Sequence, residues 1–415
     1  MLHIHELFSI ICALSVGLGI LFEKKLSIQP TVALLMTSTI ITAGIYYSNI
    51  AFLEPLSLQI LHLPFGEIFL SYMLGLLLFA GAVHVKVDNI IKVRYEIALL
   101  ALFSTLLSIG LIGAFIHVLS SLIFIPFEWI DCFIFGAIIS PTDPIAVLGL
   151  LKELKAPEKL TTLIAGESLF NDGIGIVVFN TLCAVKWGIS SPSTFTILHS
   201  FVTMSAGGIG LGLISYWLLK LIFKHPMTFT QKIMLMIAFV VCGYEVAELI
   251  HVSGALFVVT LGLSTNHLIK KNADKLIIFS FWEVIDEFLN LILFLMMGVV
   301  TLQISDQIQM NEIYFGILSI PLVILARWMS VKMAMKIAST QKKLPKNLDI
   351  VISWAGLRGA LAVALALSSP NLDSNIYHTL LVITHTNVMF SVIIQGLTSK
   401  PLLKWYINGQ TSHTT

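Results

Sequence analysis

Charged side chains are scarce in this chain of 415 residues: Asp, Glu, Lys and Arg make up 11% of it, against 57% hydrophobic residues. A soluble protein carries about 25% charged residues, which help to cover its surface with polar groups. The low charge therefore excludes soluble enzymes, nucleic-acid-binding proteins and disordered scaffolds. The chain also lacks the clustered basic segments with which proteins bind nucleic acid. The sequence predicts a protein embedded in a lipid bilayer.

Cysteine is sparse as well, with four residues that all fall in apolar stretches and share no metal-ligand spacing. We expect free thiols that pack as small apolar groups. The N-terminus lacks the positively charged segment of a secretory signal peptide, so residues 7–22 are expected to form a first membrane span. We expect no cofactor, and no soluble regulatory domain in the short tail 398–415.

Long apolar runs are what the chain has in abundance. A helix needs about 20 apolar residues to cross the hydrocarbon core of a bilayer, and Pro, Gly and charged residues delimit thirteen such runs. The sequence therefore predicts an all-α polytopic membrane protein with thirteen transmembrane helices. The predicted spans are 7–22, 30–47, 63–85, 95–125, 129–151, 160–185, 195–219, 232–250, 252–268, 282–302, 312–335, 348–369 and 376–397.

The basic residues are distributed asymmetrically across this topology. Of the 24 Lys and Arg residues, 21 lie in or beside the loops after odd-numbered spans or in the tail, and Lys186 lies on the opposite side. The other two, Arg327 and Arg358, fall within predicted spans. By the positive-inside rule, we expect the N-terminus outside and the C-terminus inside the cell membrane.

An odd number of spans suggests two six-helix halves around a linker span. Spans 1–6 and 8–13 then run in opposite directions, as in the inverted repeats of many secondary transporters. Spans five and twelve are both interrupted, by SPTDP at 140–144 and by AGLRGAL at 355–361. Pro and Gly disrupt helical geometry and free backbone carbonyls. Two discontinuous helices at corresponding positions predict the substrate site.

Span six carries polar groups on one helix face. Glu167 and Asn171 are four residues apart, and so are Ser168 and Asp172. An unpaired charge at the bilayer centre costs ~2.5–3.5 kcal/mol on insertion scales. Polar groups at this depth must therefore compensate one another or hold ions.

The charges predicted to lie inside the membrane do not balance. Four residues form this group: Asp143, Glu167, Asp172 and Arg358. Half-helix N-termini carry about half a positive charge each, which offsets one acid, assigned to Asp143. One negative charge then remains on Asp172, so the group accepts one monovalent cation or one proton. A purely structural salt-bridge cluster is the alternative, and it accounts for Glu167 and Arg358 better than for the excess acid.

The oxygen atoms available at this site suit a hard cation. Asp172, Ser168 and Thr142, together with freed backbone carbonyls, are ligands for Na⁺ or Li⁺, and no cluster of soft ligands indicates a transition metal. The sequence therefore predicts that a metal ion, Na⁺, and a proton compete for Asp172.

Four segments closely resemble the NhaP/NHE-type monovalent cation:proton antiporters, and this resemblance covers essentially the whole chain. They are FGAIISPTDPIAVLGLLKEL (135–154), LIAGESLFNDGIGIVVF (163–179), FWEVIDEFLNLILFLMMG (281–298) and ISWAGLRGALAVALAL (352–367). The resemblance implies that Asp172 binds the ion and the proton, with Ser168, the Thr142 backbone and Asp143 nearby. It further implies electroneutral 1:1 exchange, because the Asn-Asp pair 171–172 marks electroneutral members.

The resemblance also assigns structural roles and larger units. Glu167 would pair with Arg358, and Asn171 would steady the crossing of the broken helices. A homodimer in a bacterial cytoplasmic membrane is implied, in which a mobile transport unit shifts like an elevator. The units are 1–94 (dimerisation helices 1–3), 95–190 (transport helices 4–6), 191–311 (linker helix 7 and dimerisation helices 8–10) and 312–397 (transport helices 11–13).

The sequence departs from the family at Ala80, where many members carry a glutamate in span three. His84, near the inner end of that span, is a possible substitute or an interfacial residue. Selectivity for Na⁺ over K⁺ is left open by this departure, so a K⁺/H⁺ antiporter is one alternative. An intramembrane aspartyl protease using Asp143 and Asp172 is an alternative of a different class.

Further intramembrane charges stand outside this cluster, among them acids of span ten and an arginine of span eleven. Glu283, Asp286 and Glu287 are expected at the N-terminus of span ten, where they either cap the helix and pair with lysines or attract cations to the inner mouth. Arg327 is expected to be structural and to meet a carbonyl or an acid of its own half of the chain.

Overall fold

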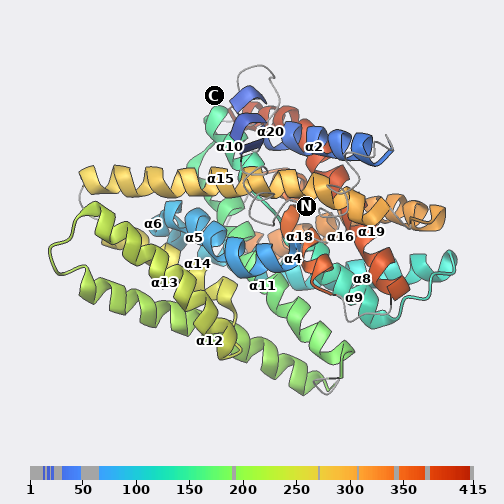
Figure 1. Ribbon diagram of the computed structural model, residues 1–415, viewed down its shortest axis with the longest axis horizontal. Helices are drawn as coiled ribbons and strands as arrows, with labels where there is room; N and C mark the ends of the chain where they lie inside the picture. Colours follow the sequence, from blue (N-terminus) through green and yellow to red (C-terminus); the bar gives the residue numbers. More distant parts are fainter. Residues whose placement is uncertain are drawn as a thin grey trace.

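Helices make up the regular secondary structure throughout the part of the chain that the computed structural model describes. The described residues are 13, 14, 16–18, 20–22, 30–47, 65–188, 193–269, 272–305, 308–340, 345–369 and 374–411. The all-α prediction is therefore confirmed for these ranges (Figure 1).

The first half of the described chain contains α2 (Pro30–Tyr47), α4 (Phe65–Ile68), α5 (Leu74–His84), α6 (Val87–Lys92), α7 (Arg94–Ala98), α8 (Thr105–Leu122), α9 (Trp129–Ile139), α10 (Ile145–Glu153) and α11 (Glu158–Lys186). The second half contains α12 (Thr194–Ile222), α13 (Phe229–Leu249), α14 (Gly254–Thr265), α15 (Asn272–Ser305), α16 (Met310–Ser339), α17 (Leu348–Ala355), α18 (Ala360–Leu367), α19 (Ser374–Phe390) and α20 (Gly396–Thr411). A short 3₁₀ turn, η3 (Asn266–Leu268), follows α14.

Every span predicted from residue 30 onward coincides with a helix or an interrupted helix. The first predicted span, 7–22, lies largely outside the described residues. Six described helices are long and apolar enough to cross a membrane: Gly66–His84, Arg94–Leu122, Glu158–Lys186, Phe195–Ile222, Met310–Ser339 and Asn375–Gly409. The chain is an integral membrane protein.

The last helix is longer than predicted. The predicted span ended at 397, whereas α20 continues to Thr411. Leu403 and Tyr406 are buried in a small core beneath α20, and Lys400 Nζ lies 2.7 Å from Glu153 Oε1 on α10. Contacts of this kind stabilise a helix whose sequence is too polar to be recognised by its apolar run.

Two helices are interrupted, as predicted, and their breaks cross each other. The SPTDP segment separates α9 from α10, and residues 356–359 separate α17 from α18. The backbone N–H of Asp143 donates to the carbonyl of Leu357 at 2.7 Å, which forms an isolated antiparallel bridge between the breaks. Because Pro141 and Pro144 have no N–H, the carbonyls near them are left for other partners.

Within the described ranges, three helices contain a π-helical segment: η1 (Phe69–Met73) between α4 and α5, η2 (Leu99–Ser104) between α7 and α8, and η4 (Ser391–Gln395) between α19 and α20. Such segments occur frequently at functional sites. Here η2 packs against α11 and α16, and Ser391 of η4 accepts a hydrogen bond from the backbone N–H of Arg358 at 2.8 Å. The π segments thus adjoin the crossing of the interrupted helices.

The long helix α15 runs across the molecule against α2 and α5 (Figure 1). The helices α12, α13 and α14 pack together along one edge, where α12 exposes large apolar side chains such as Phe195, Leu198 and Trp217. An apolar outer surface is suited to lipid. The helix α16 packs against α8 and α19 and so joins the second and last quarters of the chain.

Candidate functional site

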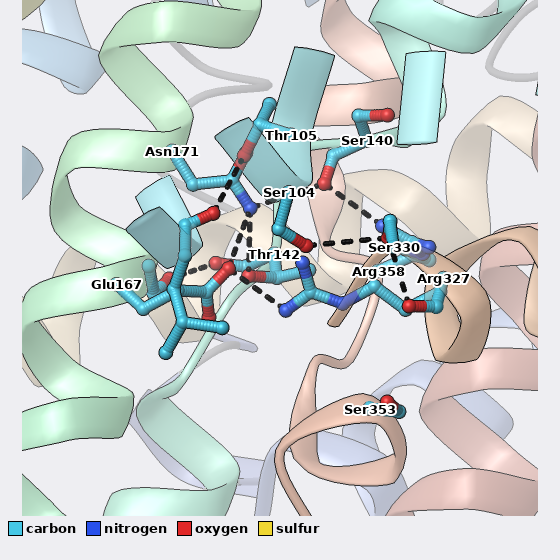
Figure 2. Close-up of polar contacts among 12 residues, drawn as sticks. Ser104, Thr105, Ser140, Thr142, Glu167, Asn171, Arg327, Ser330, Ser353 and Arg358 are labelled. Atoms are coloured by element: carbon cyan, nitrogen blue, oxygen red, sulfur yellow. Dashed lines mark hydrogen bonds and ion pairs between the residues drawn. The ribbon is translucent and has the colours of Figure 1, made fainter. Parts of the chain in front are cut away.

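The carbonyls freed at the first break are hydrogen-bonded by side chains from α11 and from the second break. The Ser140 carbonyl accepts from Arg358 Nη1 at 2.8 Å and from Asn171 Nδ2 at 3.2 Å. The Thr142 carbonyl accepts from the hydroxyl of Ser168. Figure 2 shows Arg358 and Asn171 meeting at Ser140. The side chains of α11 therefore hold the non-helical backbone in place at membrane depth, where carbonyls need partners within the protein.

Asn171 occupies the centre of this network. Besides the Ser140 carbonyl, its Nδ2 lies 3.2 Å from both Thr142 Oγ1 and Glu167 Oε1, and its Oδ1 accepts from Thr105 Oγ1 at 3.1 Å. Its side chain is fully buried. Asn171 joins α8, α11 and the break through one amide, an arrangement that supports its predicted role in steadying the crossing.

The predicted pair between Glu167 and Arg358 is wrong. Glu167 Oε1 lies 2.8 Å from Nη2 of Arg327 on α16, and both side chains are 2% exposed. Arg358 lies within the second break, and its guanidinium donates a hydrogen bond to the Ser140 carbonyl of the first break. The helix α16 packs against η2, which also contacts α11. This packing places Arg327 within ion-pair distance of Glu167. The expectation that Arg327 meets an acid of its own half is therefore also wrong.

Including Arg327 changes the charge balance of the site. The acids Asp143, Glu167 and Asp172 now face two arginines, which leaves a formal charge of one negative unit. Helix ends are no longer needed to offset one acid. Asp143 nevertheless lies at the start of α10 as expected, where its Oδ1 accepts from the Ile145 N–H at 2.9 Å. An arginine in the middle of a span almost always pairs with an acid or a carbonyl, and on that ground Arg327 could have been included in the sequence-based charge count.

Asp172 lies at a cavity of about 660 Å³. The cavity lining runs from the exposed Lys86 and Lys152 to Ser168, Asp143 and Asp172. Asp172 Oδ1 is buried and has no hydrogen-bond partner among the described residues. A carboxylate oxygen in this state lacks compensation by the protein. The structure thus brings the predicted ligands Thr142, Asp143, Ser168 and Asp172 to one cavity, while their roles in ion binding stay predictions.

The acids of predicted span ten lie in a different setting from the one expected. They are not at a helix N-terminus, because α15 begins at Asn272, well before Glu283. Glu283 and Asp286 line the cavity, and Glu283 Oε1 lies 3.5 Å from Lys152 Nζ. Glu287 is exposed. Glu283 and Asp286 are three residues apart and therefore share a face of α15. The sequence could have predicted that both acids face the same surroundings.

Span three contributes to the cavity through Gly81 and His84. Ala80, at the position where a glutamate was looked for, is fully buried and is not part of the cavity lining. The ring of His84 also lies against Phe279 of α15, with 5.4 Å between ring centroids. In the described ranges, no group of three or more His, Cys, Asp or Glu is placed to hold a metal ion.

Comparison with known proteins places this site in context. A family model described as "Sodium/hydrogen exchanger, transmembrane" matches residues 10–405. The chain is 30% identical to the Na(+)/H(+) antiporter NhaP of Pseudomonas aeruginosa over 415 residues, which cover 98% of this chain and 97% of that protein. It is 30% identical to the Na(+)/H(+) antiporter NhaG of Bacillus atrophaeus, covering 97% of this chain and 75% of that protein.

A solved structure is similar in fold. The sodium proton antiporter MjNhaP1 from Methanocaldococcus jannaschii, at pH 8, superimposes with a TM-score of 0.75 and 20% sequence identity. The match covers 96% of this chain and 97% of that one.

Proposed function

Because this chain belongs to the sodium/hydrogen exchanger family, we propose that it exchanges Na⁺ for H⁺ one for one, with Asp172 as the carboxylate for which the two ions compete. The chain is a transporter and not an enzyme. The observation that carries the mechanism is the Asp172 side chain, which lines the cavity and whose buried Oδ1 has no hydrogen-bond partner among the described residues.

The ligands around Asp172 suit an alkali cation. Ser168 and Thr142 add oxygen atoms beside the carboxylate, and hard cations prefer oxygen ligands. Na⁺ or Li⁺ and H⁺ are transported substrates, and the mechanism calls for no cofactor. The roles of Ser168, Thr142 and Asp143 as ligands are part of this proposal.

The charge balance supports exchange of one ion for one proton. The two arginines compensate two of the three acids, so one carboxylate, Asp172, is left to take a single positive charge. Binding a second cation would give the buried site a net positive charge, which is costly in a medium of low dielectric constant. The loaded site is neutral with either substrate, so its movement across the membrane carries no net charge.

The topology proposed for the whole chain has thirteen spans, with the N-terminus outside, the C-terminus inside and two inverted six-helix repeats. The crossing of α9/α10 with α17/α18 supports the repeat, because the two interrupted helices occupy corresponding positions in the halves. The cavity mouth carries Lys86 and Lys152 from the lysine-rich side. By the positive-inside rule this side is cytoplasmic, so the state described here is inward-open, in a bacterial cytoplasmic membrane.

We further propose that residues 95–190 and 312–397 move together as the transport unit of a homodimer. The contacts that join these two segments are buried and polar: Glu167 with Arg327, Ser140 with Arg358, and Ser104 Oγ with Ser330 Oγ at 3.2 Å. Residues 1–94 and 191–311 would form the stationary dimerisation unit. An elevator-like shift then exposes Asp172 to each side in turn.

K⁺/H⁺ exchange by the same mechanism is the second candidate. The cavity contains the oxygen ligands but lacks the span-three glutamate of many family members, so its ligand set does not select Na⁺ over K⁺. Purified protein in proteoliposomes distinguishes the cations: proton flux is measured on addition of Na⁺, Li⁺ or K⁺ at several pH values. Flux driven by K⁺ and not by Na⁺ would select the second candidate.

The role of Asp172 is tested in the same vesicles with Asp172→Asn. This variant is expected to fold but to lose exchange, because the amide neither carries the charge nor releases a proton. The matched control is Asp88→Asn, which changes an exposed acid on α6. Exchange near the wild-type rate by the Asp172 variant would remove Asp172 from the mechanism.

A further inference from the structure

The helix α15 presents two acids to the cavity, one turn apart. Glu283 is exposed, and its ion pair with Lys152 marks the cavity mouth. Asp286 lines the cavity beyond it and is less exposed. Asp286 is therefore a carboxylate between the mouth and the transport site, on a helix that supplies none of the residues assigned to that site.

The side chain of Asp286 is oriented by the protein. Asn290, one turn further along α15, donates through Nδ2 to Asp286 Oδ1 at 3.2 Å and to the Asp286 carbonyl at 2.7 Å. Asn290 is 3% exposed, so this amide is held firmly in place. Among the described residues, no cation is paired with Asp286. The carboxylate is thus positioned by Asn290 at the wall of the cavity, with no cation beside it among the described residues.

Neighbouring carboxylates connect Asp286 to the transport site. Asp286, Asp143 and Asp172 all line this one cavity. A cation inside the cavity is therefore attracted by more than one carboxylate. Carboxylates that repel one another are relieved when a cation lies between them.

The charges at the mouth do not cancel this attraction. Lys86 Nζ lies 2.9 Å from Glu158 Oε1, and Lys152 is paired with Glu283, so these two lysines are compensated locally. Lys155 also lines the mouth. Charges separated by more than about 8 to 10 Å of aqueous solution are largely screened at physiological salt, so the nearest acids dominate for an ion inside the cavity.

We propose that Asp286 is a second cation-binding residue, which holds the alkali cation on the cytoplasmic side of Asp172 before the cation is bound there or after it is released. This inference rests on the proposed exchange of a cation for a proton at Asp172. It assigns a binding role to the helix α15, which the proposed elevator leaves stationary. Asp286 therefore raises the local cation concentration at the inner site without moving with the transported ion.

The test is the Na⁺ dependence of exchange by Asp286→Asn in proteoliposomes with the cytoplasmic face accessible. We expect the KM for Na⁺ to rise roughly fivefold at low ionic strength, as for loss of a partly exposed charge contact, while the maximal rate stays within about twofold. At high ionic strength the difference from wild type should shrink, because salt screens the lost attraction. Asp286→Glu, which retains the charge, should keep a KM near that of wild type.

The matched control is Glu287→Gln, which removes a neighbouring charge that is exposed and outside the cavity lining. Asp286→Ser provides a second neutral variant should the asparagine variant not fold. An unchanged KM in a folded neutral variant overturns the proposal. So does a loss of maximal rate with an unchanged KM, or an equal rise in KM for Glu287→Gln.

Asp172→Asn is measured in parallel to separate the two proposals. If this variant is inactive and the Asp286 variants behave as wild type, the inference about Asp286 fails alone. If Asp172→Asn exchanges at the wild-type rate, the proposed mechanism itself fails.

Discussion

The buried ion pair between Glu167 and Arg327 makes a quantitative prediction about stability. In Arg327→Met, the Asn171 amide at 3.2 Å is the partner left to Glu167 among the described residues, and the acid becomes a buried carboxylate without its ion pair. Removing one partner of a buried pair costs about 3–5 kcal/mol. Neutralising the acid as well, in Glu167→Gln/Arg327→Met, should recover most of this loss, because replacing both charges of a buried pair is often nearly neutral.

The same reasoning predicts which arginine is coupled to Glu167. In a double-mutant cycle, Glu167 and Arg327 should show a coupling of about 2–3 kcal/mol, at the upper end for residues in direct contact. A cycle between Glu167 and Arg358 should give a smaller value, because Arg358 Nη1 is hydrogen-bonded to the Ser140 carbonyl at 2.8 Å. Arg358→Met alone should still destabilise the protein, since it leaves that carbonyl with one donor fewer.

The assay is thermal unfolding of the purified protein in detergent. For a chain of this length, 1 kcal/mol corresponds to about 1 °C in Tm, so Arg327→Met should melt about 3–5 °C below wild type and the double variant within about 2 °C of it. The result that would refute the reasoning is a cycle with no coupling for Arg327, or with a larger coupling for Arg358. Either outcome would restore the pairing expected from sequence.

Two further predictions concern local contacts. Asn171→Asp should lower both Tm and exchange activity, because it removes the amide donor and places a carboxylate against the Ser140 carbonyl and the Glu167 carboxylate; a variant with wild-type Tm would show that these hydrogen bonds are dispensable. Gly136→Ala should lower Tm by about 1–3 °C, since overpacking costs about 1–3 kcal/mol and its Cβ would lie 2.7 Å from the Ile109 carbonyl oxygen. Gly149→Ala, where nothing lies within 4 Å, should leave Tm unchanged or raise it.

Much of the architecture was predictable from local properties of the chain. Apolar runs located the helices from residue 30 onward, and the double proline of the SPTDP segment identified the first break. Spacing of four residues placed Ser168 and Asp172 on one helix face, and both line the cavity. These features depend on a few neighbouring residues, because hydrophobic length, helix periodicity and the missing N–H of proline act within one helix.

The partners across helices were decided only by the tertiary structure. Sequence offered Glu167 two buried arginines, and the choice of Arg327 depends on how closely α16 approaches α11 beside η2. The cavity position of Asp286 likewise depends on how α15 is placed against the other helices that line the cavity. The sequence by itself determined that this protein crosses a membrane, where its helices break and which face of span six is polar. The packing of helices far apart in the chain determined which charged residues form pairs. The reason is that a buried charge pairs with the opposite charge nearest to it in space.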